Sequence, residues 1–361
     1  MPEVLHPVVA QVLPVAVFLL AITVTAEIAQ LAGVFDVAAH AMARRARHRV
    51  LLLWLTFAAL AVVCTIVLSL DTTAVLLTPV GLAIAQQTGI APMPFALTTL
   101  WLANTGSLLL PVSNLTNLLA VHRFEDLGAD HGDYVRTAAL PAVTAIVVTL
   151  VLIAVLQRRL LRGTYAVDPP AAPHDRVLLV VAAVTCLAIG PLFAVGLEPA
   201  VVSVASAAVL LAALLWRAPG LLREVRPPWL MAGAFLVVAG LLRAAQSEGL
   251  LDWLAPAVGT GVRPLDLLHL AGASAVGANL VNNLPAYLLV EPAAADDVRR
   301  LVATLVGVNT GALVTPWASL ATLLWLQRCR SAGLQVPLLK LAGWGALCAT
   351  LCVAAATVTI R

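Results

Sequence analysis

Polar side chains recur in two segments that are otherwise apolar, and the two segments match at fixed spacing. The first runs from Asn104 to Leu119 (NTGSLLLPVSNLTNLL) and the second from Asn309 to Leu324 (NTGALVTPWASLATLL). Asn, Gly, Ser and Pro inside an apolar helix interrupt its hydrogen-bond ladder and free backbone groups, which can then bind an ion or a polar solute. A kinked packing helix is the alternative. We expect two broken helices, with candidate binding residues Asn104, Ser113, Asn114, Asn117, Asn309, Ser319 and Thr322.

A further polar interruption lies upstream of each segment. The first runs from Ser69 to Thr73, with its tip at Asp71, Thr72 and Thr73, and the second runs from Asn279 to Pro285, with its tip at Asn282 and Asn283. We expect both to be tips of re-entrant hairpins and candidate binding residues. The second hairpin has arms of roughly 264–278 and 286–291, too short to cross about 30 Å at about 1.5 Å per residue. Residues 50–69 are long enough for a full span, which would leave Asp71 in an outside turn, but the repeat favours a hairpin.

Ionisable residues within apolar stretches are functional candidates by default. Asp71 can carry a proton or bind a cation, or it can cap the returning helix. Glu27 and Arg243 occupy matching places in the two halves, and we expect a charge pair with a coupling or a structural role. Asp266 and His269 lie near the outer mouth of the second hairpin, where solvated roles are favoured over metal binding.

The composition sets the class of the elements that hold these residues. Of the 361 residues, 61% are hydrophobic and 11% are charged, with a mean hydropathy of +1.00. Soluble domains average about 45–50% apolar and about 25% charged residues. Continuous apolar runs favour helices over a β-barrel in the bilayer. The sequence therefore predicts an all-α polytopic membrane protein.

Basic residues alternate between loops and predict the orientation. Clusters at 44–49, 158–176, 217–226 and 328–330 fall on one side, which should be cytoplasmic and places the N-terminus outside. The matched segments then run in opposite directions, which predicts inverted-topology repeats. We divide the chain into a first repeat (1–157), a cytoplasmic linker (158–176) and a second repeat (177–361).

Several classes of protein are disfavoured. The sequence contains no HExxH or GxSxG motif and no Asp-rich metal pair on a helix, so we expect no enzyme activity, catalytic residue or cofactor. The five cysteines are best interpreted as buried small hydrophobes rather than as a metal site. The basic residues are scattered, which argues against nucleic-acid binding.

The motifs resemble the ion transporter superfamily, in particular its arsenite permease branch. The resemblance covers nearly the whole chain. It rests on the runs at 70–79, 104–119, 282–285, 307–311 and 319–325, together with the arm at 27–49. It implies elevator-like transport domains, each with two hairpin tips and two broken helices, on a scaffold that often forms a homodimer. It also implies export of arsenite or antimonite coupled to protons.

Three departures from the family pattern matter. The chain opens at what would be the family's third span, so either the start is truncated or the scaffold is reduced. The Ser-Asn-Thr tips of the sodium-coupled dicarboxylate branch are absent, and no Arg or Lys stands at the tips to clamp a dianion. Ala318 replaces Ser113 in the second repeat, so the two half-sites are unequal.

We therefore expect a multi-pass inner-membrane secondary transporter that exports arsenite or antimonite by proton antiport and confers arsenical resistance. The alternative is a sodium/proton antiporter or a sodium-coupled permease for a small anion such as a carboxylate. Its partners would be a small inorganic or organic anion or oxyacid, H⁺ or Na⁺, and the lipid bilayer. Substrate, coupling ion, stoichiometry, direction and oligomeric state stay open.

Overall fold

The chain is a bundle of helices in the computed structural model, which describes residues 17–18, 20–167, 175–195, 197–225, 227, 229, 233, 237 and 258–361. Within these residues the β-structure consists of one isolated antiparallel bridge, between Arg49 and Thr164. The all-α prediction is confirmed. The elements are Leu20–Leu31, α2 (Val34–Arg45), α3 (Val50–Leu68), α4 (Leu70–Thr88), α5 (Met93–Thr105), η1 (Pro111–Ser113), α6 (Leu115–Asp126), α7 (His131–Leu156), α8 (Arg176–Ala194), α9 (Pro199–Arg217), η2 (Pro219–Glu224), α12 (Pro264–Val281), α13 (Asn283–Ala294), α14 (Val298–Leu305), η3 (Val306–Thr310), α15 (Leu320–Ser331) and α16 (Leu338–Val358).

Both matched segments break at the same repeat positions. In the first, α5 ends at Thr105 and α6 begins at Leu115. In the second, α14 continues into the π-helical turn η3, which ends at Thr310, and α15 begins at Leu320. Each break follows the Asn-Thr-Gly and contains the shared proline, which supplies no backbone N–H to a helix. The broken helices also pack reciprocally, because α15 contacts α5 and α6 contacts α14.

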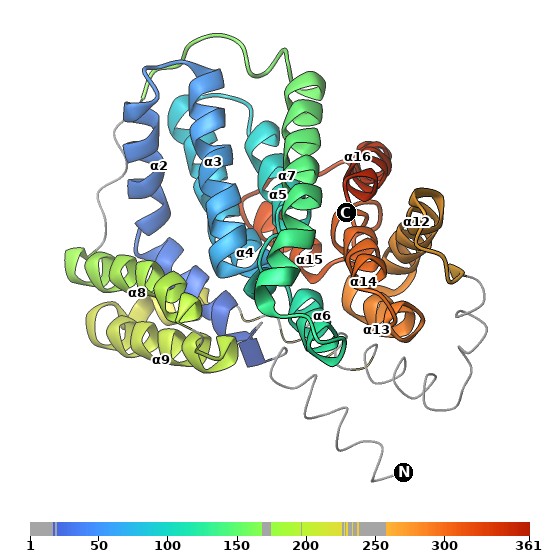
Figure 1. The fold of residues 1–361 in the computed structure, drawn as a ribbon. Coiled ribbons are helices and arrows are strands. Elements are labelled where there is room, and N and C mark those ends of the chain that lie inside the picture. Colours follow the sequence, from blue (N-terminus) through green and yellow to red (C-terminus); the bar gives the residue numbers. More distant parts are fainter. Residues whose placement is uncertain are drawn as a thin grey trace.

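Two helical hairpins lie next to the breaks, and a single residue joins the arms of each. Ser69 connects α3 to α4, and Asn282 connects α12 to α13. The polar interruptions therefore do coincide with hairpin turns, although the turn of the first lies at Ser69, two residues before Asp71. In Figure 1, α2 to α5 lie on one side of α7 and α12 to α14 lie on the other.

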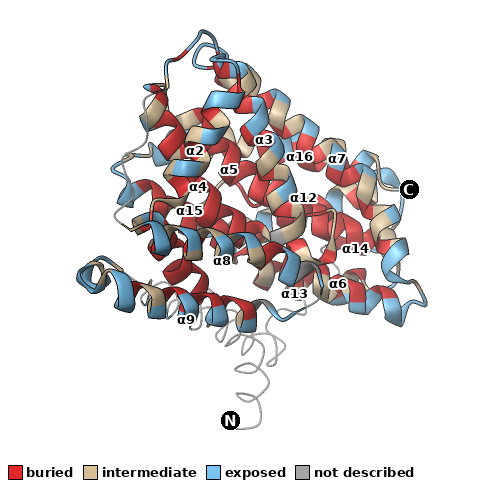
Figure 2. Cartoon of the chain, turned by 90° about the vertical axis from the view of Figure 1, so that its left-hand side faces the viewer, coloured by how far each residue is buried: buried red, intermediate tan, exposed pale blue. Residues whose placement is uncertain are grey.

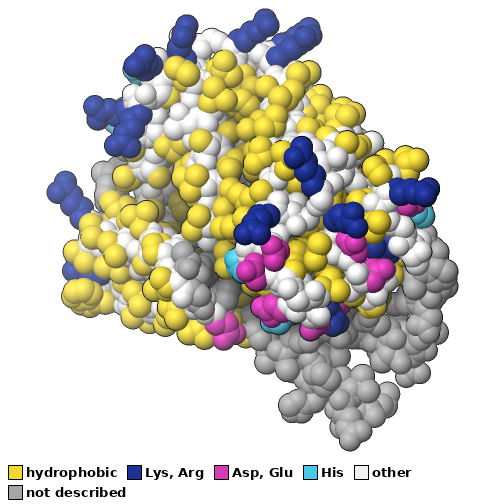
Figure 3. All heavy atoms as spheres, in the orientation of Figure 1, with side chains coloured by type: hydrophobic (Ala, Val, Ile, Leu, Met, Phe, Trp, Pro, Cys, Tyr) yellow, Lys and Arg dark blue, Asp and Glu magenta, His cyan; other side chains and the backbone are white. Residues whose placement is uncertain are grey.

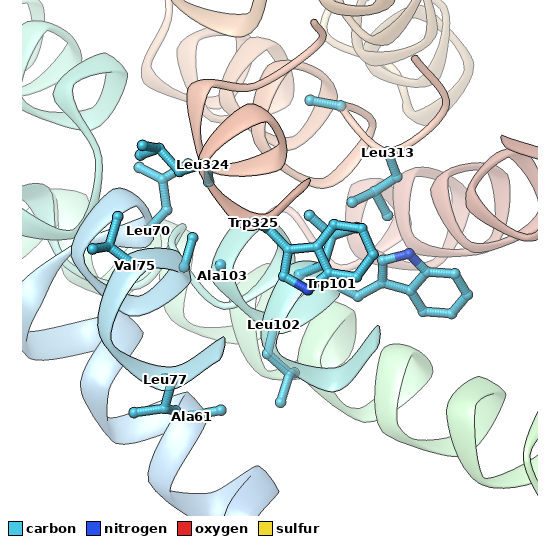
Figure 4. Packing of buried hydrophobic residues seen from close by; sticks show 14 of the residues in the cluster. Ala61, Leu70, Val75, Leu77, Trp101, Leu102, Ala103, Leu313, Leu324 and Trp325 are labelled. Atoms are coloured by element: carbon cyan, nitrogen blue, oxygen red, sulfur yellow. The ribbon is translucent and has the colours of Figure 1, made fainter. Parts of the chain in front are cut away.

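The most buried elements are those that carry the polar residues. Figure 2 shows α4, α5 and α15 as largely buried helices inside a shell of half-exposed ones. Trp325 of α15 donates its indole N–H to the Ala96 carbonyl of α5 at 2.7 Å, and Figure 4 shows Trp325 beside Trp101 in the buried apolar cluster. This packing fixes α15 against α5.

The outer helices supply the membrane-spanning surface. By length and composition, α3, α7, α9 and α16 can each cross a membrane, and Leu20–Leu31 with Val34–Arg45 makes a further span if that pair, bent by 66°, is counted as one. Basic side chains gather where α2, α3 and α7 meet their loops, while acidic ones lie in the lower half of Figure 3. This distribution agrees with the charge asymmetry read from the sequence. The direction of insertion stays a prediction.

The start of α8 is anchored outside the apolar region by an ion pair. Arg217 at the end of α9 lies 2.7 Å from Asp175, whose carboxylate also accepts the Leu178 backbone N–H at 2.8 Å. The Arg217 hydrogen bond, followed by that backbone donor, lowers the pKa of the Asp175 carboxyl from its ordinary value. This pair joins the ends of two helices that pack side by side.

Part of the expected linker packs against the first half. Tyr165 donates its hydroxyl to the Ala43 carbonyl at 2.7 Å, and its backbone N–H reaches the His48 carbonyl at 3.1 Å. Residues 158–167 are thus held to α2 and to the turn that follows it. The division of the chain at 158–176 remains a prediction.

Candidate functional site at the two helix breaks

Asn309 of the second repeat is the centre of a buried amide and hydroxyl cluster. Its Oδ1 accepts from Asn114 Nδ2 at 2.8 Å and from Thr116 Oγ1 at 2.9 Å. Its Nδ2 donates to Asn117 Oδ1 at 2.8 Å. All four side chains are buried. One amide from the second half therefore binds three side chains at the first break, the predicted site residues Asn114 and Asn117 together with Thr116.

Asn117 extends this cluster into the first break itself. Its Nδ2 donates to the Ser107 carbonyl at 2.6 Å and to the Leu110 carbonyl at 3.1 Å. These are carbonyls that the interrupted helix has freed. Asn114 caps α6, because its Oδ1 accepts the Thr116 backbone N–H at 3.2 Å. The Ser107 and Leu110 carbonyls and the Thr116 N–H at the first break are accordingly paired by asparagine side chains.

The repeat-related residues of the second break are not paired in this way. Ser319 and Thr322 stand where Asn114 and Asn117 stand in the first segment. The Oγ of Ser319, the Oγ1 of Thr322 and the Oδ1 of Asn104 are buried and have no hydrogen-bond partner among the described residues. Asn104 is the repeat mate of Asn309, and its Nδ2 is used locally, on the Leu100 carbonyl at 2.9 Å. We call Asn104, Ser319 and Thr322 the open set.

The second break is held to its hairpin by Asn279 of α12. The Asn279 Oδ1 accepts the backbone N–H groups of Val314 and Thr315 at 2.9 and 3.1 Å. Its Nδ2 donates to the Gly311 carbonyl at 2.7 Å. The Asn279 carbonyl accepts from Thr315 Oγ1 and from Trp317 Nε1. One asparagine thus satisfies much of the freed backbone of the second break.

The tip of the second hairpin completes that attachment. Asn282 Nδ2 donates to the Trp317 carbonyl at 2.8 Å, and the Asn283 backbone N–H donates to the Ala318 carbonyl at 2.8 Å. Gly311 makes the approach possible, because a Cβ on it would overlap Ala275 of α12. The predicted tip residues therefore contact the predicted break directly.

Fewer side-chain hydrogen bonds join the first break to its hairpin than join the second break to its own. Ser113 donates its hydroxyl to the Ile66 carbonyl of α3 at 2.8 Å. Gly106 lies near Thr65, whose Cγ2 would be 3.6 Å from a Cβ at that position. Thr65 in turn donates to Thr73 Oγ1 at 3.3 Å. Because Ala318 replaces Ser113 in the second repeat, the hydroxyl bond of the first half has no side-chain counterpart there.

Both hairpin tips have strained backbones. Ser69 has φ 129° and ψ 165°, and Asn282 has φ 122° and ψ 153°. This region is occupied almost only by glycine and costs about 1–3 kcal/mol for other residues. Each tip residue also caps the following helix, since Ser69 Oγ accepts the Thr72 N–H at 3.3 Å and Asn282 Oδ1 accepts the Leu284 N–H at 3.3 Å. The two tips therefore share one backbone conformation and one kind of cap.

Asp71 lies in the first turn of α4. Ser69 makes the cap of that helix, as described above, so the capping role considered for Asp71 belongs to Ser69. The Oδ1 of Asp71 is buried and has no hydrogen-bond partner among the described residues. A carboxylate next to a hairpin tip with an unpaired oxygen is suited to take up a proton or a cation.

Glu27 has a partner that the sequence did not suggest. Its Oε1 lies 3.6 Å from Arg328 Nη1, and Arg328 also donates to the Thr23 carbonyl at 3.1 Å. A cavity of about 420 Å³ adjoins this pair and is also lined by Gln30 and Gln327. Arg243, the predicted partner of Glu27, lies outside the described residues.

The structure therefore brings many of the predicted residues to the breaks or the tips, and adds others that sequence reasoning missed. The added residues are Ser69, Asn279 and Thr116. A mid-helix Asn in an apolar run was the available signal for Asn279, whereas nothing in the sequence marks Ser69 as a residue with positive φ.

Among the described residues, the side-chain hydrogen bonds at the breaks and tips come from amides, hydroxyls and one indole, and none from Lys or Arg. Such groups suit an uncharged polyol, an uncharged oxyacid or a small cation better than a dianion, which would need a positive partner.

Comparison with known proteins gives the family. Residues 2–324 match the family model CitMHS, described as "Citrate transporter". The "Arsenical pump membrane protein" of Escherichia coli is 27% identical over 327 residues, which cover 81% of this chain and 73% of that protein. A "46 kDa membrane protein" of Mycobacterium leprae is 24% identical over 348 residues, covering 88% of this chain and 79% of the relative. The YdaH transporter of Alcanivorax borkumensis aligns at 16% identity with a TM-score of 0.49, covering 99% of this chain and 86% of that one. The chain therefore belongs to the citrate transporter (CitMHS) family of membrane transporters, within the ion transporter group.

Proposed function

We propose that this transporter exports arsenite or antimonite across the inner membrane in exchange for protons, with its N-terminus outside. The open set and Asp71 would hold the substrate and the proton, and the Asn309 cluster would hold the two breaks together. Curated relatives that cover 81% of the chain are named arsenical pump membrane proteins, which supports this substrate.

The observation that carries the proposal is the set of buried oxygens without partners. A buried hydroxyl or amide oxygen left unpaired costs about 1–3 kcal/mol, so a ligand that pairs with it gains affinity. Arsenite near neutral pH is mostly As(OH)₃, which is uncharged and carries hydroxyl donors. The three oxygens of the open set accept hydrogen bonds. The chemistry of these groups therefore matches a neutral trihydroxy solute.

Asp71 supplies a site for the coupling ion. A protonated Asp71 is neutral and costs far less in an apolar surrounding than an ionised Asp71, which requires a partner there. Exchange of a proton for substrate would let the tip change its charge as the substrate binds or leaves. The Asn substitution removes that titration with little change of shape.

A second candidate is supported by the description of the matching family model as a citrate transporter. In this alternative the chain is a sodium-coupled permease for a small carboxylate, or a sodium/proton antiporter. The same oxygens can coordinate Na⁺, but a carboxylate with two or three charges would need a positive partner. No Lys or Arg takes part in the described hydrogen bonds at the tips, which favours arsenite over citrate.

Arsenite uptake into everted membrane vesicles tests the proposal. Vesicles with the wild-type protein should accumulate arsenite when a proton gradient is imposed and lose that accumulation when an uncoupler collapses the gradient. Asp71→Asn should abolish the gradient-driven part, because the residue can no longer exchange a proton. Membrane levels of both proteins are matched by immunoblotting.

The same vesicles are also tested for citrate uptake driven by a sodium gradient. Citrate uptake that requires a sodium gradient, with no arsenite accumulation by well-folded wild type, would reject the arsenite assignment and establish the second candidate. A helix-surface control is Thr350→Val, which removes an exposed hydroxyl bonded only to its own helix at 2.9 Å. It should transport like wild type.

A further inference from the structure

Two cysteines of α16 form a buried pair behind the helix breaks. Cys348 and Cys352 lie one turn apart with their Sγ atoms at 3.9 Å, and neither is exposed. The hydroxyl oxygen of Thr149 on α7 lies 3.4 Å from Cys352 Sγ and 3.9 Å from Cys348 Sγ. Both sulfurs and the hydroxyl therefore face a common point between α7 and α16.

This point is connected to both broken helices. Thr149 donates its hydroxyl to Thr105 Oγ1 at 2.9 Å, and Thr105 is the last residue of α5 before the first break. Gly345, one turn before Cys348, is so close to the Leu313 carbonyl of the second break that a Cβ would overlap it. The two thiols thus lie one layer behind the elements that carry the open set.

The helix prevents the pair from closing into a disulfide. Residues four apart on an α-helix have Cβ atoms about 5–6 Å apart, whereas a disulfide needs about 3.5–4.5 Å. A single atom inserted between the sulfurs removes that conflict, because the bridge then consists of two bonds to the inserted atom. The geometry consequently favours a bridged dithiol over an oxidised one.

We propose that Cys348 and Cys352 bind trivalent arsenic or antimony as a two-thiol chelate. For arsenite the reaction is As(OH)₃ + 2 RSH → (RS)₂AsOH + 2 H₂O. Two S–H and two As–O bonds break, two As–S bonds and the two O–H bonds of the released waters form, and arsenic stays trivalent, so no oxidant or reductant is needed. The remaining As–OH group hydrogen-bonds to Thr149 Oγ1.

The number of ligands separates trivalent arsenic from structural zinc. Structural zinc requires four protein ligands, and no group of three or more His, Cys, Asp and Glu side chains suited to a metal exists among the described residues. Trivalent arsenic needs three ligands and brings its own hydroxyl. Two thiols on one helix face are therefore sufficient for arsenic and too few for zinc.

The thiol site is distinct from the transport site proposed above. The open set offers oxygen ligands and exchanges its substrate, whereas a dithiol holds arsenic through covalent bonds. Arsenic bound at this site would draw the two sulfurs together and change their contacts with Thr149. Because Thr149 donates a hydrogen bond to Thr105, that change would alter the end of α5 at the first break. The binding test below needs no transport, so it can fail or succeed independently of the arsenite exporter proposal.

The test measures arsenic bound to the purified, reduced full-length protein in detergent, with arsenite alone as the probe. The triple variant Cys64→Ala, Cys186→Ala, Cys329→Ala keeps only the pair. After desalting, elemental mass spectrometry should find one arsenic per chain, and X-ray absorption at the arsenic edge should find two sulfur neighbours and one oxygen. The same spectrum is expected from wild type.

Single variants on the triple background supply the matched control. Cys348→Ser and Cys352→Ser each leave one thiol, nearly unchanged in shape, and should retain arsenic at least tenfold more weakly. Monodisperse elution shows that each variant is folded. Three results would overturn the proposal: no arsenic retained by wild type, arsenic with oxygen neighbours only, or equal retention by either serine variant.

Discussion

The two helix breaks have the same sequence frame but distribute their hydrogen bonds in opposite ways. At the first break, Asn114, Thr116 and Asn117 pair with Asn309 across the molecule, while a single side-chain hydroxyl joins the break to its hairpin. At the second, Asn279 holds the freed backbone to the hairpin. The side chains of Ser319 and Thr322 have no partner among the described residues.

The different hydrogen bonding of the two breaks suggests that one break supports the structure and the other binds the substrate. A binding site is effective when its backbone is held in place and its polar side chains are free to meet the ligand. The second break has both properties, whereas at the first break the amides of Asn114 and Asn117 are paired with Asn309. We infer that two matched segments can divide these tasks by exchanging Asn for Ser and Thr at two positions.

The largest expected effect comes from Asn309→Ala. This change removes three side-chain hydrogen bonds and leaves polar groups of Asn114, Thr116 and Asn117 buried without their partner, which should cost about 3 kcal/mol of stability. Thermal unfolding in detergent would measure it. The repeat mate provides the control, because Asn104→Ala breaks one local hydrogen bond and should cost about 1 kcal/mol or less. Equal losses for the two variants would contradict the proposed division of tasks.

The next effect concerns the attachment of each break to its hairpin. Asn279→Ala deprives two backbone N–H groups of their acceptor and the Gly311 carbonyl of a donor, and should destabilise the protein by about 2 kcal/mol. Ser113→Ala breaks one hydrogen bond at the first break and should cost about 1 kcal/mol. Chemical unfolding and limited proteolysis near residues 311–319 check the order. If Ser113→Ala proves the more damaging, the first break is the better supported.

The smallest effect tests the strain at the first tip. Ser69→Gly relieves the cost of positive φ while losing a cap for which glycine is a fair replacement, so stability should rise by about 1 kcal/mol. Ser69→Ala keeps the strain and loses the cap, so stability should fall by about 1 kcal/mol. Differential scanning fluorimetry distinguishes the two. A fall with both variants would show that the tip geometry depends on the serine hydroxyl rather than on tolerance of strain.

The positions of the breaks were predictable because they follow from local chemistry. Asn, Gly and Pro interrupt a helix wherever it packs, so the repeated NTG and Pro place the ends of α5 and η3 and the starts of α6 and α15. The all-helical membrane class follows equally directly from the hydropathy. These features depend on residues close together in the chain.

The partners of the polar side chains were not predictable, because tertiary packing selects them. The hydrogen bonds from Asn114 and Thr116 to Asn309 join residues almost two hundred positions apart. The placement of the first tip at Ser69 shows a second limit, since serine seldom adopts positive φ and a glycine would have been expected there. Glu27 illustrates a third, because several arginines of the sequence could have met it and Arg328 does.

The most direct test of the account is arsenite uptake by Thr322→Val. Valine has nearly the shape of threonine and removes only a buried hydroxyl that has no partner among the described residues, so the melting temperature should stay the same or rise. Loss of one hydrogen bond to bound arsenite, about 1.4 kcal/mol, corresponds to roughly tenfold weaker apparent affinity in gradient-driven uptake. Affinity reduced at unchanged stability is the predicted result. Unchanged affinity for arsenite in Thr322→Val, and again in Ser319→Ala, would contradict the claim that the second break binds the substrate.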